Sequence, residues 1–190
     1  ITDRLLPTLS IGSSSSFNYS DMNQNFSLVK KKKRIATIVT ALQIIEPRLT
    51  DISLLSDGIY VDVQHKPQLI PLTTMGNGFQ RIANLLLALP SVSNGLLVID
   101  GIEDSLHFSV HGRLWEVIAS VAEKLNIQIF ATTYSLEVIR AANMVFSKMK
   151  DDQFRYYRLD RSIGTETVVA KKYSPKTLQA ALDMGYEVRG

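Results

Sequence analysis

Residues 96–100 read Leu-Leu-Val-Ile-Asp, a short apolar run that ends in a carboxylate. An unalternating apolar run of this length is typical of a strand buried on both faces of a parallel sheet. Helical patterns flank it at about residues 79–89, 109–125 and 135–142, and a second buried strand is expected at residues 127–131. Strands that alternate with helices predict right-handed parallel crossovers. The predicted fold is therefore α/β, a mostly parallel sheet with flanking helices.

The composition is that of a globular protein. Apolar residues make up 45% of the 190 residues and charged residues 21%, which is enough for a buried core. The absence of cysteine excludes a disulfide framework and a thiolate metal site. No apolar run reaches the roughly 18 residues that cross a bilayer, and the chain has no signal-type start. We expect a cytoplasmic protein with no membrane partner, and Ile1 in place of a methionine indicates a piece of a longer chain.

Segments outside the α/β core have other patterns. Residues 1–26 include a run of four serines and are expected to be loosely structured. Ser27 is the expected N-cap of a helix in which apolar residues recur at helical spacing from Ile35 until Pro47 ends the pattern. Short segments rich in β-branched residues predict small antiparallel elements within residues 49–72 and again within residues 144–173.

A basic run, Lys30 to Arg34, falls near the start of the first predicted helix. Cations at a helix N-terminus oppose the helix macrodipole, so the run invites a functional explanation. A solvated helix start is the simpler interpretation. An acidic partner such as DNA is the alternative, although a net charge of only +3 does not by itself indicate a nucleic-acid-binding protein.

Two features have chemistry suited to a nucleotide. Asp100 ends a hydrophobic strand, which is where a carboxylate can hold Mg²⁺ beside a nucleotide. The turn Thr74-Met75-Gly76-Asn77-Gly78 leads into a helix; its glycines allow close backbone approach, and the helix start presents N–H groups to an anion. Taken alone, the turn is better explained as an ordinary helix entry, and an aspartate after an apolar run is common.

Three segments in a fixed order are more specific. They are PLTTMGNGFQR at residues 71–81, LLVIDGIEDSLH at residues 96–107 and IQIFATTYSLE at residues 127–137. This order resembles the C-terminal half of ATP-binding-cassette (ABC) ATPases of the SMC class. In particular, it is similar to the AAA-type bacterial ATPases related to the ATPase part of the overcoming-lysogenisation-defect (OLD) nucleases. Residues 27–190 would then form the C-terminal lobe of such a P-loop ATPase domain.

The resemblance implies roles for individual residues. The turn Thr74 to Gly78 corresponds to the signature motif, which in the family contacts the γ-phosphate of ATP held by the opposite protomer. Asp100 corresponds to the Walker B aspartate and is the expected Mg²⁺ ligand. The segment from Glu103 to His107 corresponds to the D-loop at the dimer interface. Tyr134 occupies the switch position, next to the γ-phosphate in the family.

Three departures from the family pattern predict weak or lost hydrolysis. Gly101 stands where the family has a glutamate that orients or deprotonates the attacking water, and the loss of a general base commonly costs about 10²–10⁴-fold in rate. Glu103 is the candidate for a partial substitute. Tyr134 replaces the usual histidine and brings no positive charge. The motif G-x-x-x-x-G-K-[ST] is absent, so the phosphate loop (Walker A) would come from an N-terminal half that the chain lacks.

The sequence thus predicts the C-terminal lobe of an ABC/SMC-like ATPase that encloses ATP and Mg²⁺ in a dimer and is inactive on its own. The expected partners are the missing N-terminal half or a second protomer, in a homo-oligomer. One alternative is an active ATPase in the intact protein, with Glu103 or a partner residue positioning the water. The other is a module on the same fold that binds nucleic acid or protein and does not use ATP.

Overall fold

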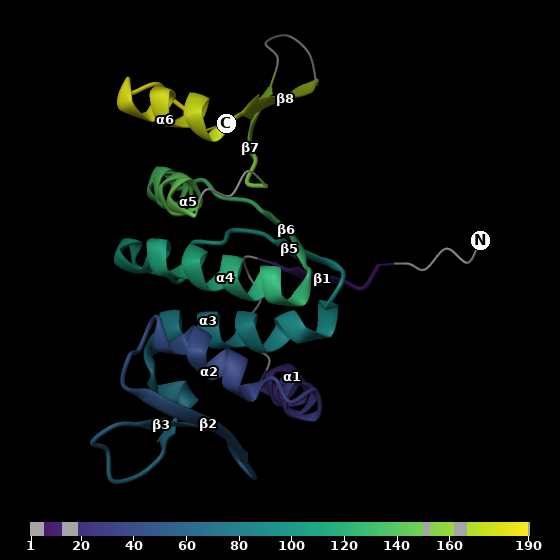
Figure 1. The fold of residues 1–190 in the computed structure, drawn as a ribbon, viewed down its shortest axis with the longest axis vertical. Coiled ribbons are helices and arrows are strands. Elements are labelled where there is room, and N and C mark those ends of the chain that lie inside the picture. Colours follow the sequence, from purple (N-terminus) through teal and green to yellow (C-terminus); the bar gives the residue numbers. More distant parts are fainter. Residues whose placement is uncertain (1–5, 13–18, 150–152, 162–166, 190) are drawn as a thin grey trace, which may run out of the picture. The chain divides into compact units, whose positions relative to one another are not determined.

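The computed structural model describes residues 6–12, 19–149, 153–161 and 167–189 (Figure 1). The run of four serines at residues 13–16 lies outside these ranges. The chain divides into two compact units, and the boundary between them falls after Thr132. No helix in the described part of the chain combines the length and the apolar character needed to cross a membrane.

Three parallel strands form the centre of the first unit. They are β1 (Thr8–Ile11), β5 (Leu96–Ile99) and β6 (Gln128–Ala131), in the spatial order β1-β5-β6 (Figure 1). Helix α4 (His111–Leu125) lies between β5 and β6 in the chain and provides the crossover that a parallel pair requires. The predicted parallel sheet is confirmed, and it gains a strand, β1, from the segment that was expected to be loosely structured.

Within the first unit, the central strand β5 has one buried face, whereas burial on both faces was expected. Side chains alternate between the faces of a strand, and on β5 Leu97 and Ile99 are buried while Leu96 and Val98 are partly exposed. On β6, Phe130 is 55% exposed. The reason is that α3 (Gly76–Ala88) and α4 line the Ile99 side of the sheet within the first unit, and β6 is an edge strand among the described residues.

Helix α4 has the predicted amphipathic face. Its buried positions recur at helical spacing, and they are Leu114, Val117, Ile118, Val121 and Leu125. A 3₁₀ turn, η3 (Phe108–Val110), precedes it, so the regular helix begins two residues later than predicted. The helix ends at Asn126 in the left-handed conformation, a common way to close a helix.

The first predicted helix is in fact two helices, α1 (Tyr19–Lys31) and α2 (Ile35–Gln43). The chain turns between them, and Lys33 has a left-handed φ of 55°. Lys30 and Lys31 therefore lie in the last turn of α1, where cations interact favourably with the macrodipole, and not at a helix start as predicted. Two lysines of the basic run thus have a structural reason for their position.

An antiparallel sheet, β2 (Leu49–Leu55), β3 (Gly58–Val63) and β4 (Ile70–Pro71), confirms the prediction for residues 49–72. The β2–β3 turn contains Asp57, and Gly58 has a φ of 146°. Tyr60 donates a hydrogen bond of 2.6 Å to the Asp57 carboxylate, and this bond raises the pKa of the phenol. The sheet leads through the 3₁₀ turn η1 (Leu72–Thr74) directly into α3.

The second unit consists of α5 (Leu136–Lys148), the antiparallel pair β7 (Tyr156–Arg161) and β8 (Val168–Tyr173), and α6 (Pro175–Asp183). Its core contains Ile139, Leu178, Leu182 and Val188. Ser135 caps α5 as predicted, by accepting a hydrogen bond from the Val138 amide. Helix α5 extends six residues beyond the predicted end at Ala142, so the strands of this unit begin later than residue 144.

The C-terminal segment is fixed by short-range charge interactions. Arg189 pairs with Glu187 at 2.9 Å and lowers the pKa of that carboxyl to about 2. The phenol of Tyr156 donates to the Val188 carbonyl at 2.7 Å. The Tyr156 bond holds the last described residues against β7, whereas the Glu187–Arg189 pair lies within the segment itself.

Candidate functional site

The three parallel strands of the first unit end side by side, and Asp100 follows the central one. The register pairs Ile99 with Ile11 on β1 and with Ala131 on β6. The Asp100 amide donates to the Ile11 carbonyl at 2.8 Å, which fixes the backbone, while the carboxylate is exposed. Open parallel sheets bind ligands at this carboxyl edge.

Thr132 follows β6 as Asp100 follows β5, and the two side chains meet. The Thr132 hydroxyl donates to Asp100 Oδ1 at 2.5 Å and accepts a hydrogen bond of 3.0 Å from the Gly101 amide. Sequence analysis missed Thr132. The signal was available, because matching the ends of the two apolar runs puts residue 132 beside residue 100.

The loop after Asp100 folds back on itself. The Asp104 amide donates to the Gly101 carbonyl at 3.0 Å, and the Leu106 amide donates to the Glu103 carbonyl at 2.9 Å. Gly101 has a φ of 60°, a conformation that side chains other than glycine rarely adopt. A Cβ atom at Gly101 would lie 2.6 Å from Asp104 Oδ2. The Asp104 carboxylate therefore occupies the space where a side chain at position 101 would begin.

Arg81 joins α3 to this loop. Its Nη2 atom donates to the Gly101 carbonyl at 2.9 Å and lies 4.0 Å from Asp104 Oδ2, and its side chain is only 13% exposed. The start of the same helix also lies close to this loop. A Cβ atom at Gly78 would be 3.5 Å from both Leu106 Cδ2 and the Ser105 carbonyl oxygen. The glycine turn and the loop after β5 are thus neighbours. We call Asp100, Gly101, Asp104 and Thr132, with Arg81, the strand-end cluster.

The glycine turn lies at the entry to α3, as predicted, although the helix begins at Gly76 and not near Phe79. Gly76 has a φ of 72°, and the Met75 side chain makes no capping hydrogen bond. The first N–H groups of a helix have no partner within the helix. Thr74 and Asn77 are exposed, so the turn presents a helix start and a hydroxyl to solvent.

Each predicted site residue can now be placed. The turn Thr74 to Gly78, Asp100 and Glu103 belong to the first unit, and Glu103 lies in the loop between Gly101 and Asp104. Tyr134 belongs to the second unit, two residues along the chain from Thr132, and is 80% exposed.

Two members of the strand-end cluster, Asp100 and Thr132, have the oxygen donors that Mg²⁺ prefers. Mg²⁺ is usually bound by one or two carboxylates together with waters and substrate phosphates. Asp100 and Thr132 offer a carboxylate and a hydroxyl at one strand edge, which fits a metal that also binds a nucleotide. Within the described ranges, no group of three or more histidine, cysteine or acidic side chains forms a self-sufficient metal site.

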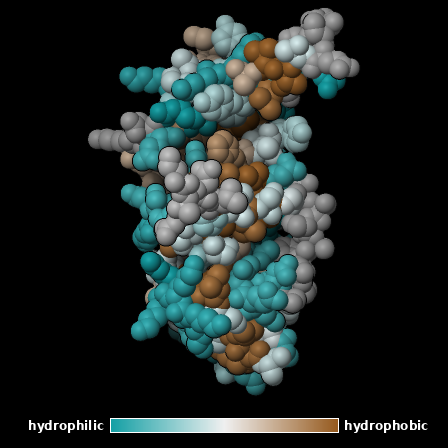
Figure 2. Space-filling view, turned by 90° about the vertical axis from the view of Figure 1, so that its right-hand side faces the viewer, coloured by the Kyte–Doolittle hydropathy of each residue, from teal (hydrophilic) through white to brown (hydrophobic). Residues whose placement is uncertain are grey.

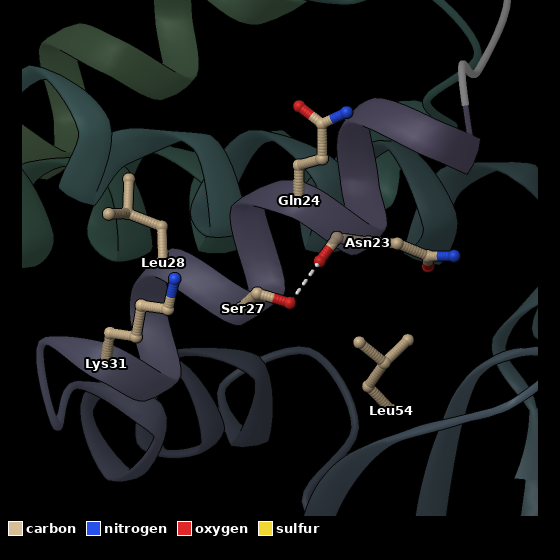
Figure 3. A pocket seen from close by; sticks show the side chains of 6 residues that line it. All are labelled: Asn23, Gln24, Ser27, Leu28, Lys31 and Leu54. Carbon is tan, nitrogen blue, oxygen red and sulfur yellow. Dashed lines mark hydrogen bonds between the residues drawn. The ribbon is translucent and has the colours of Figure 1, made fainter.

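A separate hollow of about 520 Å³ lies between α1 and β2. Figure 3 shows its lining, which includes Asn23, Ser27, Lys31 and Leu54. The Ser27 hydroxyl donates back to the Asn23 carbonyl at 3.0 Å, within the helix. The hollow shares no residue with the strand-end cluster.

Residues 9–140 match the family described as "AAA domain, putative AbiEii toxin, Type IV TA system". The chain belongs to this AAA-domain family. The matched range includes the glycine turn, Asp100, the loop after it and Tyr134. No curated protein matches the sequence.

Solved structures of SMC ATPase heads have a similar fold. One, described as "Structural biochemistry of ATP-driven dimerization and DNA stimulated activation of SMC ATPases", has a TM-score of 0.55 and 14% identity over 91% of this chain and 100% of that one. The SMC head domain from Thermotoga maritima gives the same TM-score and identity over 87% of this chain. An SMC head bound to the C-winged helix domain of ScpA has a TM-score of 0.55 and 10% identity, also over 87% of this chain.

This AAA protein spans only about half of two of these heads, namely 53% of the Thermotoga maritima chain and 55% of the ScpA-bound one. At such low identities the likeness shows the fold. Together with the family match, it confirms the predicted α/β fold: the chain is an AAA-domain protein whose fold is similar to that of SMC heads. The relation to OLD nucleases stays a prediction.

Proposed function

We propose that residues 27–190 are the C-terminal lobe of an ABC/SMC-like ATPase that encloses ATP and Mg²⁺ between two molecules. The observation that carries the proposal is the position of Asp100 at the carboxyl end of the central strand, with the glycine turn linked to the adjoining loop through Arg81 and Leu106. In this proposal Asp100 binds the Mg²⁺ side of the nucleotide. The turn Thr74 to Gly78 contacts phosphate across the interface.

A second part of the proposal concerns the phosphate loop. The 190 residues contain no G-x-x-x-x-G-K-[ST] motif, so the loop and its lysine would be supplied from outside this sequence. The supplier would be an N-terminal half or a second protomer. Residues 27–190 alone would then be inactive.

Hydrolysis by the completed site is expected to be slow. Gly101 provides no carboxylate, and Tyr134 provides no positive charge for the phosphate. Phosphoryl transfer depends on positioning and on electrostatic stabilisation of the phosphate oxygens, so both losses act on the chemical step. Glu103 is the substitute that the sequence suggests.

Asp100→Asn tests the nucleotide site in the intact protein. We expect the affinity for Mg²⁺–ATP to fall about tenfold or more, because an amide replaces a charged metal ligand. Equilibrium binding of a fluorescent ATP analogue, with and without Mg²⁺, measures the change. Asp51→Asn, at an exposed position on β2, removes the same charge and should leave the affinity unchanged. Equal affinities for wild type and Asp100→Asn would contradict the proposal.

The open sheet face supports association. Figure 2 shows hydrophobic side chains at the surface among hydrophilic ones, and Phe130 of the edge strand β6 is exposed. Apolar surface and an unpaired strand edge both favour contact with another chain. We expect light scattering to give a mass above that of a monomer at high concentration. Phe130→Ser should lower that mass, and a monomer at every concentration would contradict the expectation.

The second candidate function is a module that binds a polyanion such as DNA without ATP. It is favoured by the five cations Lys30 to Arg34, which are all exposed and, among the described residues, form no ion pair. If this function operates, DNA affinity should fall steeply with salt. Neutralising Lys33 and Arg34 with glutamine should reduce the slope of log affinity against log salt by about two. Affinity that responds neither to salt nor to neutralisation removes this candidate.

A further inference from the structure

We propose that Asp104 takes over the role of the glutamate that position 101 lacks and accepts the proton of the attacking water. The inference rests on the proposed ATPase function and names the residue that carries its slow hydrolysis. Sequence reasoning pointed to Glu103 instead. The structure gives three reasons to choose its neighbour.

The first reason is the space that the Asp104 carboxylate fills. From the position of a Cβ atom at Gly101, Asp104 Oδ2 is 2.6 Å away, Cγ is 2.9 Å away and Oδ1 is 3.0 Å away. These are the three nearest heavy atoms, and none belongs to Glu103. The Asp104 carboxylate therefore lies on the side of residue 101 from which a glutamate side chain at that position would project.

The second reason is that the carboxylate is held in place and still reachable. The Asp104 amide donates to the Gly101 carbonyl, and Arg81 donates to that same carbonyl while its Nη2 atom lies 4.0 Å from Asp104 Oδ2. The Asp104 side chain is 35% exposed. A general base has to be both positioned and accessible to the water from which it takes a proton.

The third reason is that Asp100 and Asp104 are suited to different roles, Asp100 as the metal ligand and Asp104 as the base. Asp100 Oδ1 already accepts the Thr132 hydroxyl at 2.5 Å, which fixes it at the strand end as the metal-side carboxylate. Asp104 is four residues along the chain, on the loop that follows. Different parts of the chain thus contact the two carboxylates, namely Thr132 after β6 for Asp100 and Arg81 on α3 for Asp104.

The proposed step is hydrolysis of the terminal phosphoryl group. The water oxygen forms a bond to the γ-phosphorus, and the bond from that phosphorus to the bridging oxygen breaks, with its electron pair remaining on ADP. The proton released by the water passes to the Asp104 carboxylate. The products are ADP and inorganic phosphate, and no oxidant or further reactant is needed.

Asp104→Asn in the intact protein tests the inference, because the amide keeps the size of the side chain and cannot take up the proton. We expect single-turnover phosphate release to slow at least tenfold, whereas the affinity for Mg²⁺–ATP stays within about twofold of wild type. Asp104→Glu, which keeps a carboxylate, should retain more activity than Asp104→Asn.

The outcomes separate the two proposals. If wild type does not bind Mg²⁺–ATP and Asp100→Asn changes nothing, the proposed function fails. If wild type binds the nucleotide but Asp104→Asn releases phosphate as fast as wild type, or wild type releases none, only the present inference is overturned. Loss of turnover in Glu103→Gln together with normal turnover in Asp104→Asn would assign the base to Glu103. Asp51→Asn is the charge-matched control on β2, and the thermal midpoint of each variant reports its folding.

Discussion

Replacing Gly95 by alanine is expected to destabilise the first unit by about 3 kcal/mol or more. A Cβ atom at this position would overlap the Pro7 carbonyl oxygen and would lie 2.9 Å from the Val92 carbonyl oxygen. Both are backbone atoms, so no side-chain rotation can relieve the overlap. The Leu96 amide also donates to the Pro7 carbonyl, and moving Pro7 away would break the first bond between β1 and β5.

Denaturant unfolding followed by Trp115 fluorescence measures this effect. Trp115 is the only tryptophan in the sequence, and it is nearly buried on α4 of the first unit. The matched control is Gly112→Ala on the same helix, where a Cβ atom would meet nothing within 4 Å. Alanine is a better helix former than glycine, so this variant should be neutral or more stable by up to about 1 kcal/mol. Equal stabilities for the two alanine variants would contradict the packing argument.

Local patterns predicted the elements that carry the site. The period of apolar residues in α4, the apolar run of β5 and the Ser135 cap are all set by neighbours in the chain, and the structure confirms them. The break between α1 and α2 was missed because the apolar pattern that predicted the helix begins only at Ile35, and the charged residues 30–34 before it carry no apolar spacing that could show a break. The turn depends on Lys33 adopting a left-handed conformation, which residue type alone does not indicate.

Long-range pairing was harder to predict. Strand β1 is as long as β5, but its sequence Thr-Leu-Ser-Ile lacks the continuous apolar run that identified β5. Its place beside β5 is fixed by bonds such as the one from the Asp100 amide to Ile11. The burial of β5 on one face only was missed for a related reason, since an apolar run does not reveal what covers it. At the candidate site the sequence indicated Asp100 and the glycine turn. The contacts of Arg81 and Asp104 required the folded chain, because they join α3 to the loop after β5.

The proximity of Asp104 to Gly101 also changes what to expect from restoring the family glutamate. In Gly101→Glu the new side chain would start from a residue at φ 60°, and its Cβ atom would overlap the Asp104 carboxylate. The left-handed conformation costs a side chain of this kind about 1–2 kcal/mol, and two carboxylates in contact repel each other. We expect the first unit to lose about 2–3 kcal/mol of stability.

The variant Gly101→Glu is also expected to show no gain in ATP turnover. The loop backbone has a conformation that favours glycine at position 101, and the Asp104 carboxylate already occupies the space beside it. Adding Asp104→Ala should recover about 1 kcal/mol by removing the overlap, and the strain at φ 60° should remain. Gly101→Asn is the matched control, since asparagine tolerates the left-handed conformation better than other side chains. Trp115 fluorescence and phosphate release measure the two effects. A large rise in turnover in Gly101→Glu alone would contradict this expectation. It would mean that the loop accommodates the new side chain and that Asp104 does not replace the missing glutamate.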